Sequence, residues 1–339
     1  MKFRASLGGA RVRAPGGLEN LVMDETLPVR SPGPGEIQVA LKALSLNYHD
    51  YLVILGRLPT TDGRVPMSDG AGDVIEVGEG VTSFVPGDSV ISLFFPRWQD
   101  GRLEGNDFRY IPGDGIDGYA RRCVTVPATA FTRAPANYTH VEGATLPCAG
   151  VTAWRALAEG GIQSEDVVLV QGTGGVSIFA LQFAKAAGAS VIATSSSPAK
   201  LERLKALGAD HVINYRDNPD WGQIARKLSG GVDHVIEVGG SGTIAESISA
   251  CRNGGHIALI GILTGSSGPI SIAKLMAKQI RLSGITVGSR RHQLEMVSAI
   301  EACEIRPVID CTFPLEGLAD AFRYQESGGH FGKICILIE

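Results

Sequence analysis

The sequence contains few cysteines and no long apolar run. Its six cysteines are scattered, and none forms the CxxC pair or the short spacing that a disulfide framework or a zinc lobe would require. No apolar stretch approaches the ~18 residues needed to cross a bilayer, and the N-terminal residues lack the apolar core of a secretion signal. We therefore expect reduced thiols in a soluble, cytoplasmic protein without a membrane partner.

A basic cluster is also missing. The 31 Lys and Arg residues are balanced by 35 Asp and Glu residues, and the formal net charge is −4. Because proteins bind a phosphate backbone with Lys and Arg gathered on one face, we predict no nucleic-acid partner. Glycine, in contrast, is abundant: 44 of the 339 residues, roughly twice the usual share. Since these glycines follow no Gly-X-Y period, they indicate many tight turns.

The first third of the chain predicts short strands between turns. Apolar and polar residues alternate along residues 37–43 after a Pro-Gly turn, and further strands are expected at residues 72–77 and 89–94. This pattern is typical of a half-buried antiparallel sheet, and we interpret it as a small β-barrel. Residues 95–118 lack any periodicity, so we expect a long loop there, and loops of that length are often functional.

From about Asp166 the pattern changes to apolar strand, glycine turn and amphipathic helix, repeated. Strands are expected at residues 166–171, 190–194, 211–215, 232–238 and 256–261, and helices at 176–187, 198–207, 220–228 and 243–251. Alternating strands and helices predict an α/β fold with a parallel, doubly wound sheet. A last helix (317–326) and strand (334–338) are expected to return to the first domain. The predicted domains are residues 1–128 with 290–339, and residues 129–289.

A glycine-rich turn lies between the first strand and the first helix of the parallel region. Its residues are Gly172, Thr173, Gly174, Gly175 and Val176. Glycines at such a crossover let backbone N–H groups and the helix N-terminus approach a pyrophosphate, which predicts a dinucleotide site. Ser177 replaces the third glycine of the usual pattern, and its small side chain still permits close packing. The alternative is that the turn is purely structural.

The residues after the second strand indicate which dinucleotide binds. Enzymes that bind NAD usually place a carboxylate there to accept the ribose hydroxyls. This chain has no acid in residues 194–200; it has Ser195, Ser196 and Lys200. A missing carboxylate and a present ammonium both favour the 2′-phosphate, so we predict NADP(H). The alternative is that the serines cap the following helix and Lys200 is solvated.

Six further motifs complete the pattern. They are residues 45–50 (SLNYHD), 69–72 (DGAG), 77–78 (VG), 86–90 (PGDSV), 148–152 (CAGVT) and 206–210 (ALGAD). With the glycine turn, they resemble the medium-chain dehydrogenase/reductase superfamily over nearly the whole chain. The resemblance implies a GroES-like β-barrel substrate domain, a Rossmann domain and hydride transfer in a cleft between them. It also implies a homodimer, formed through a strand at residues 280–287.

The residues that bind zinc in related enzymes are mostly replaced. Zinc-dependent alcohol dehydrogenases of this superfamily hold the catalytic metal with a Cys, a His and a second Cys. Asn47 stands at the first Cys position, Ser68 at the His position and Asp69 at the following Glu position, so only Cys148 remains. The match is therefore closer to the zinc-free quinone oxidoreductase branch, which carries Asn at this position. The alternative is a metal site rebuilt from His49, Asp69 and Cys148.

The same resemblance suggests further cofactor contacts. Lys200 and Tyr215 correspond to residues that contact the 2′-phosphate in the quinone oxidoreductase branch, and Lys333 to a basic residue near the pyrophosphate. Thr152 is placed to approach the nicotinamide. The alternatives are a solvated charge at Lys333 and an ordinary helix-interior threonine at Thr152.

The expected reaction follows from the missing metal. Without a Lewis acid, we expect NADPH to reduce a quinone or the β-carbon of an α,β-unsaturated carbonyl, small molecules whose carbonyl accepts hydrogen bonds from Asn47 and Tyr48. Tyr48 and His49 are candidate donors of a hydrogen bond or a proton, or they form a packing pair. Two alternative functions remain: an alcohol dehydrogenase of the same superfamily, and a non-catalytic NADPH-binding protein.

Overall fold

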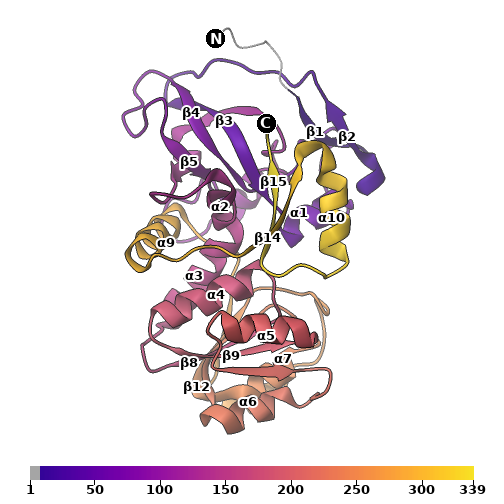
Figure 1. Cartoon of the computed structure of the whole chain (residues 1–339), viewed down its shortest axis with the longest axis vertical. Helices are drawn as coiled ribbons and strands as arrows, with labels where there is room; N and C mark the ends of the chain where they lie inside the picture. The colour runs from indigo at the N-terminus through magenta and orange to yellow at the C-terminus, as the bar shows by residue number, and fades with distance from the viewer. Residues whose placement is uncertain (1–7) are drawn as a thin grey trace. The chain divides into compact units, whose positions relative to one another are not determined.

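The structure, a computed structural model, describes residues 8–339 (Figure 1). The chain forms two compact units. The first contains the described residues up to Val151 together with Gly288–Glu339, and the second is Thr152–Val287. The first boundary therefore lies later than the predicted residue 128. The physical reason is that β7 (Phe131–Arg133) pairs with β5, and α2 (His140–Ala144) packs on β3 and β4, so this segment is part of the first unit.

The first unit is organised around a long central strand, β3 (Glu36–Ser45). The strands run in the order β14-β15-β3-β4-β5-β7, with β6 also paired to β3. The other strands of this sheet are β4 (Gly70–Val77), β5 (Ser89–Ser92), β6 (Cys123–Pro127), β14 (Ile309–Pro314) and β15 (Lys333–Leu337), and β1 (Gly9–Val12) and β2 (Leu21–Asp24) form a separate hairpin. Strand β3 is antiparallel to β4, β6 and β15, as the alternating pattern of residues 37–43 predicts.

The return of the chain end to the first unit is confirmed. Strand β15 pairs with β3, with Cys335 opposite Ser45. This register places Lys333, the first residue of β15, beside the end of β3. Four helices belong to this unit: α1 (Tyr48–Ile54), α2, α9 (Arg290–Cys303) and α10 (Leu318–Glu326). The expected loop at 95–118 has one 3-10 turn, Gly105–Tyr110, and is otherwise irregular.

The second unit contains a six-stranded parallel sheet in the order β10-β9-β8-β11-β12-β13. Its strands are β8 (Val167–Gln171), β9 (Ser190–Ser195), β10 (His211–Asn214), β11 (Val232–Glu237), β12 (Cys251–Leu259) and β13 (Arg281–Gly284), and its helices are α3 (Val151–Gly160), α4 (Gly175–Ala186), α5 (Pro198–Ala206), α6 (Trp221–Ser229), α7 (Ile244–Ala250) and α8 (Ile272–Ala277). Figure 1 shows α4 and α5 above these strands and α6 below them. The predicted doubly wound sheet is confirmed.

The strand order explains where a ligand can bind in this unit. From β8 the chain winds through β9 to β10, and it then returns to the other side of β8 with β11, β12 and β13. Ligands of such sheets bind outside the carboxyl ends of the strands at this reversal point. The glycine turn follows β8, so the local strand-turn-helix signal and the topology agree on one position. No helix within residues 8–339 is long and apolar enough to cross a membrane.

Candidate functional site

Buried polar residues gather at the carboxyl end of β3. We call them the polar cluster: Asn47, Asp50, Ser68, Asp69 and Lys333. Asn47 precedes α1 and Asp50 lies in its first turn, Ser68 and Asp69 precede β4, and Lys333 begins β15. All five belong to the first unit. The sheet register thus brings together residues from three distant parts of the sequence. Among them are Asn47, Ser68 and Asp69, the predicted replacements of residues of the zinc enzymes.

Lys333 determines the orientation of the Asn47 amide. Its ammonium donates hydrogen bonds to Asn47 Oδ1 at 2.6 Å and to the Leu46 carbonyl oxygen at 2.5 Å. Since an ammonium can only donate, the Asn47 oxygen must face Lys333 and the Nδ2 group must face away. Nδ2 donates to Asp69 Oδ2 at 2.9 Å and to Ser68 Oγ at 3.4 Å. Both amide hydrogens of Asn47 are therefore engaged within the cluster.

Asp50 connects the cluster to the backbone. Its side chain accepts hydrogen bonds from the backbone N–H of Ser68 at 2.9 Å and from that of Asn47 at 3.2 Å. Sequence analysis did not single out Asp50 as a site residue. A signal for it existed, because Asn followed three residues later by an acidic residue is typical of a helix N-terminus. Burial raises the pKa of Asp50, and the charge of His49 opposes this shift.

Burial leaves Asp69 about half protonated near neutral pH. Burial raises the pKa of Asp69 to about 7, with Lys333 opposing the shift and Asp50 adding to it. Asp69 Oδ1 is buried without a hydrogen-bond partner among residues 8–339. A neutral carboxyl tolerates such a position better than a carboxylate does, because an unpaired buried charge costs far more than an unpaired polar atom. The cluster thus contains one ammonium and two carboxyl groups whose pKa values burial raises.

These residues do not fit a catalytic zinc ion. The Asn47 amide presents its hydrogens to Asp69, and the Lys333 ammonium already supplies a buried positive charge to the cluster. Burial, together with the charge of Asp69, raises the pKa of the Cys148 thiol well above its usual value, whereas zinc binds the thiolate. No group of three His, Cys, Asp or Glu side chains suited to a metal ion occurs in the described part of the chain.

The rebuilt metal site from His49, Asp69 and Cys148 also does not fit. His49 Nε2 lies 3.6 Å from Asp114 Oδ2 in the 95–118 loop, and its ring contacts Phe94 edge-on. Asp69 Oδ2 is instead engaged by Asn47 and, at 3.4 Å, by the backbone N–H of Cys148. The side chains of His49 and Asp69 therefore have different neighbours. The 95–118 loop, whose role the sequence left open, supplies the charged neighbour of His49.

The three predicted catalytic residues are consecutive but lie in different environments. Asn47 is buried in the polar cluster, His49 is half-buried, and the Tyr48 side chain is 40% exposed. Tyr48 and His49 occupy the first turn of α1, which Asp50 ties to Asn47. Of the three side chains, Tyr48 is thus the most accessible to a substrate.

In the second unit, the glycine turn has the features of an anion site. Gly172 adopts a φ of 72°, which only glycine adopts readily, and a Cβ placed on Gly172 or Gly174 would meet no atom within 4 Å. Helix α4 has no acidic residue in its first turn and no side-chain hydrogen bond at its N-cap, Gly174. The first backbone N–H groups of α4, at the positive end of the helix dipole, therefore have no acceptor from the N-cap side chain.

The predicted 2′-phosphate residues come together beside this turn. Ser195 ends β9, the strand next to β8, and Asn214 of β10 pairs with it, so Tyr215 follows at the same edge. Ser196 is half-buried and Tyr215 is exposed. Ser197 caps α5 by accepting a hydrogen bond from the Lys200 backbone N–H at 3.4 Å, which confirms the predicted helix start. Ser195, Ser196 and Tyr215 thus lie at neighbouring strand ends, and Lys200 lies in the first turn of the helix that follows β9.

Two predicted cofactor residues are buried in the structure. Thr152 is 3% exposed within α3, and Lys333 is 4% exposed in the polar cluster. Their expected contacts with the nicotinamide and the pyrophosphate stay predictions. What sequence reasoning missed is that Lys333 binds Asn47, since a pairing between residues 286 positions apart leaves no local pattern.

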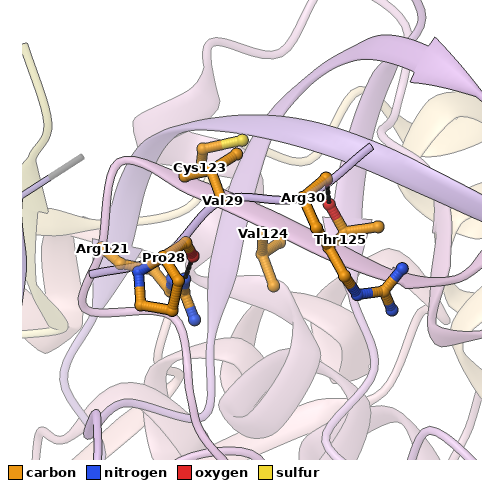
Figure 2. A pocket seen from close by; sticks show the side chains of 7 residues that line it. All are labelled: Pro28, Val29, Arg30, Arg121, Cys123, Val124 and Thr125. Carbon is orange, nitrogen blue, oxygen red and sulfur yellow. Dashed lines mark hydrogen bonds between the residues drawn. The ribbon is translucent and has the colours of Figure 1, made fainter. Parts of the chain in front are cut away.

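A separate hollow in the first unit is not a candidate site. Its volume is about 200 Å³, and its lining residues are Pro28, Val29, Arg30, Arg121, Cys123, Val124 and Thr125 (Figure 2). Thr125 and Arg121 donate hydrogen bonds to the carbonyl oxygens of Arg30 and Pro28. The Arg30 guanidinium is paired with Glu36, and burial raises the pKa of Cys123 to about 11. The polar side chains of this hollow thus hold residues 28–30 against residues 121–125 and are already engaged in hydrogen bonds or ion pairs.

Two family models match this chain. The model of the alcohol dehydrogenase GroES-like domain matches residues 33–136, and that of zinc-binding dehydrogenases matches residues 175–302. A zinc-type alcohol dehydrogenase-like protein of Schizosaccharomyces pombe is 42% identical over 334 residues, with 95% of this chain and 96% of the relative covered. An acryloyl-coenzyme A reductase of Sulfurisphaera tokodaii is 29% identical, with 92% of this chain and 95% of the relative covered.

Among solved structures, the crystal structure of an NAD-dependent alcohol dehydrogenase is similar to this chain with a TM-score of 0.88 and 34% identity. The comparison covers 98% of this chain and 100% of that chain. Together with the two family models, this similarity confirms the expected fold class in both units.

The buried Asp69 carboxyl predicts a stability that falls as pH rises. The folded chain keeps a proton up to about pH 7, whereas the unfolded chain, with the ordinary pKa of 3.8, has released it. Between about pH 5 and pH 8 the free energy of unfolding should fall by about 3 kcal/mol through this group. Asp69→Asn should lack this decrease in urea unfolding experiments.

The matched control is Glu76→Gln, which neutralises an exposed carboxylate of the same strand, β4. It should keep the wild-type dependence on pH. A wild-type slope in Asp69→Asn would contradict the assignment of the proton to Asp69.

Proposed function

Because this chain belongs to the medium-chain dehydrogenase/reductase superfamily, we propose that it is an NADPH-dependent, zinc-free reductase. Its substrate in this proposal is an α,β-unsaturated carbonyl compound or a quinone. The observation that carries the proposal is the hydrogen-bonded set Asn47, Asp69 and Lys333, because these side chains satisfy one another where related enzymes bind a metal ion. The similarity to an acryloyl-coenzyme A reductase supports a conjugated substrate.

The residues proposed to hold the dinucleotide lie in the second unit. Backbone N–H groups of residues 172–176 and the N-terminus of α4 suit a pyrophosphate. Ser195, Ser196, Lys200 and Tyr215 suit a 2′-phosphate, since these neighbouring strand ends present hydroxyl groups and an ammonium but no carboxylate. A dihydronicotinamide, when bound, supplies the hydride.

Tyr48 and His49 are the proposed donors to the substrate. Both hydrogens of the Asn47 amide are engaged by Asp69 and Ser68, so Asn47 acts here by holding the cluster and the start of α1 in place. The exposed Tyr48 hydroxyl can donate a hydrogen bond to a carbonyl oxygen, which polarises the conjugated system. The His49 imidazole, oriented by Asp114, is the proposed proton donor.

An alcohol dehydrogenase is the second candidate, because the relative from Schizosaccharomyces pombe and the similar crystal structure carry that name. Oxidation of an unactivated alcohol requires a Lewis acid or a strong base at the hydroxyl group. The polar cluster provides neither, because its cation, Lys333, is engaged by Asn47 and Leu46. This difference in chemistry separates the two candidates by experiment.

A second copy of the chain is the proposed partner of the second unit. Strand β13 is the edge of the six-stranded sheet, and five apolar side chains are exposed in the segment before it: Ile262, Leu263, Ile270, Ile272 and Met276. An open sheet edge beside an exposed apolar surface favours association. We therefore keep the homodimer through residues 280–287 as part of this proposal.

The proposed reaction predicts activity without metal. Purified protein should oxidise NADPH with enones or quinones, should leave simple alcohols unreacted, and should contain no stoichiometric zinc by elemental analysis. Tyr48→Phe should lower kcat on the enone at least about tenfold, the usual scale for a lost donor. Tyr51→Phe on the same helix, which packs against Phe322, should retain activity. Turnover of alcohols with one equivalent of zinc would instead establish the dehydrogenase.

Cofactor preference gives a further prediction. Lys200→Gln should weaken NADPH binding about tenfold or more and change NADH binding little, because it removes a charge expected to face only the 2′-phosphate. Fluorescence titration measures both dissociation constants. Lys205→Gln on the same helix, whose ammonium pairs with Glu202, should change neither. Equal affinity of the unmodified protein for NADPH and NADH would contradict the preference.

The dimer can be tested by sedimentation. Ile272→Glu combined with Met276→Glu adds charge at two side chains that are 77% and 76% exposed, so it should yield monomers without unfolding the chain. The control Val85→Glu, at an exposed apolar residue of the first unit, should sediment like the unmodified protein. An unmodified protein that sediments as a monomer would refute the dimer.

A further inference from the structure

A buried carboxylate lies at the carboxyl end of β11 in the second unit. Glu237 is 0% exposed, yet its two oxygens accept five hydrogen bonds. Oε1 accepts from the backbone N–H groups of Gly239 and Gly240 at 2.8 and 2.9 Å and from Thr243 Oγ1 at 2.6 Å. Burying a charge is costly unless donors replace water, and here the donors come from the loop after β11, from β8 and from α7.

The second oxygen of Glu237 binds residues of β8 and α7. Oε2 accepts a hydrogen bond from Gln171 Nε2 at 2.8 Å and another from Ser247 Oγ. Gln171 is the last residue of β8, directly before the glycine turn, and its side chain also donates to Ser247 Oγ at 2.7 Å. Its carbonyl oxygen accepts from Ser177 Oγ at 2.6 Å. Gln171 thus connects Glu237 to both ends of the turn that Gly172–Val176 form.

The loop after β11 is in turn bound to the loop after β12. Thr264 Oγ1 donates to the Gly239 carbonyl oxygen at 2.9 Å and accepts from the Gly242 backbone N–H at 3.0 Å. The Ser241 backbone N–H donates to the Gly265 carbonyl oxygen at 3.0 Å. Hydrogen bonds therefore connect three loops along one edge of the sheet: residues 172–176, 238–243 and 260–265. The Glu237 side chain binds the second of these loops directly and the first through Gln171.

This edge is where a doubly wound sheet binds its ligand, since the strand order reverses between β8 and β11. A negative charge beside a pyrophosphate site is electrostatically unfavourable for binding. The carboxylate is nevertheless buried there, and both of its oxygens accept hydrogen bonds. We therefore look for its role in these hydrogen bonds and not in its charge. They determine the conformation of the loops on both sides of the reversal point.

We propose that Glu237 is a positioning residue of the dinucleotide site. Its carboxylate holds the 172–176 and 238–243 loops, through Gln171, in the conformation that accepts the cofactor. This inference rests on the proposed function only in assuming that a nicotinamide dinucleotide binds the glycine turn. It assigns a role to Glu237 and Gln171, two polar residues at the ends of apolar strands.

The test uses the full chain and a polarity swap. In Glu237→Gln the new NH2 group faces the Gln171 Nε2 donor, so the side-chain hydrogen bond between residues 237 and 171 is lost while Gly239 and Gly240 keep an acceptor. Gln171 Oε1 keeps its longer contacts with the backbone N–H groups of Val238 and Gly239, at 3.3 and 3.4 Å. NADPH and NADH should both bind about tenfold more weakly. A simple charge effect has the opposite sign, because removal of a negative charge would tighten the binding of an anion. The readout is the dissociation constant by fluorescence titration, beside thermal unfolding.

The double variant Gln171→Glu with Glu237→Gln reverses donor and acceptor across the same contact. It should restore both dissociation constants to within about threefold of the unmodified values, the coupling that a hydrogen-bonded pair shows. Glu246→Gln is the matched control: this carboxylate of α7 binds the Gly222 backbone N–H and no strand-end loop, so cofactor binding should be unchanged. If Glu237→Gln fails to fold, Thr243→Val, which removes one donor to Oε1, should give an intermediate loss of affinity.

The outcomes separate the two hypotheses. If the unmodified chain binds neither NADPH nor NADH, the proposed function and this inference both fail. If the unmodified chain binds but Glu237→Gln binds equally well or more tightly, only the positioning role is refuted. A weakened single variant that the swap does not restore also refutes it, because the effect then does not pass through Gln171.

Discussion

The hydrogen bond from the Lys333 ammonium to the Asn47 oxygen is the interaction on which the chemistry of the first unit depends. It joins the first residue of the last strand to the helix that follows β3, so it exists only because β15 pairs with β3. An ammonium can only donate, and it therefore determines which way the Asn47 amide points. From that orientation follow the contact with Asp69 and the engagement of Ser68. Burial raises the pKa of Asp69 to about 7, and both the Lys333 charge and the Asn47 hydrogen bond oppose that shift.

The second unit also has a buried charged side chain at the end of a strand, but this one, Glu237, is negative. Lys333 begins a strand and Glu237 ends one, and each side chain is satisfied by partners from neighbouring chain segments. Buried charges that lack partners cost several kcal/mol, so each of these groups restricts the segments around it to conformations that supply hydrogen bonds. In both units polar residues at strand ends, rather than apolar packing, determine the local geometry of the candidate site.

Membership of the superfamily leaves the reaction open, because function resides in the site and not in the fold. Two of the matching descriptions mention zinc, yet in this chain the Asn47 amide binds the Lys333 ammonium through its oxygen and Asp69 through its NH2 group. The same framework thus places a different set of functional groups at the end of β3. That replacement is the reason for preferring reduction of an already activated carbonyl compound.

Much of the second unit could be predicted from sequence because its signals are local. The continuous apolar strand before Gly172, the Ser197 cap and the absence of an acid after β9 each depend on a few neighbouring residues. The first boundary between the units could not be predicted, since it depends on β7 pairing with β5 over a long separation. For the same reason the partners of Lys333 and of Glu237 were not found.

The sequence by itself therefore determined the two kinds of sheet and the glycine turn through its local patterns, and its motifs indicated the superfamily through their resemblance to known ones. Only the tertiary structure decided that Asn47 has no free amide hydrogen, that burial raises the pKa of Asp69, and that His49 has Asp114 as its neighbour. The physical reason is that helices, strands and turns follow from interactions between residues close in sequence. The protonation and orientation of a buried polar group depend instead on which distant segments the sheet register brings beside it.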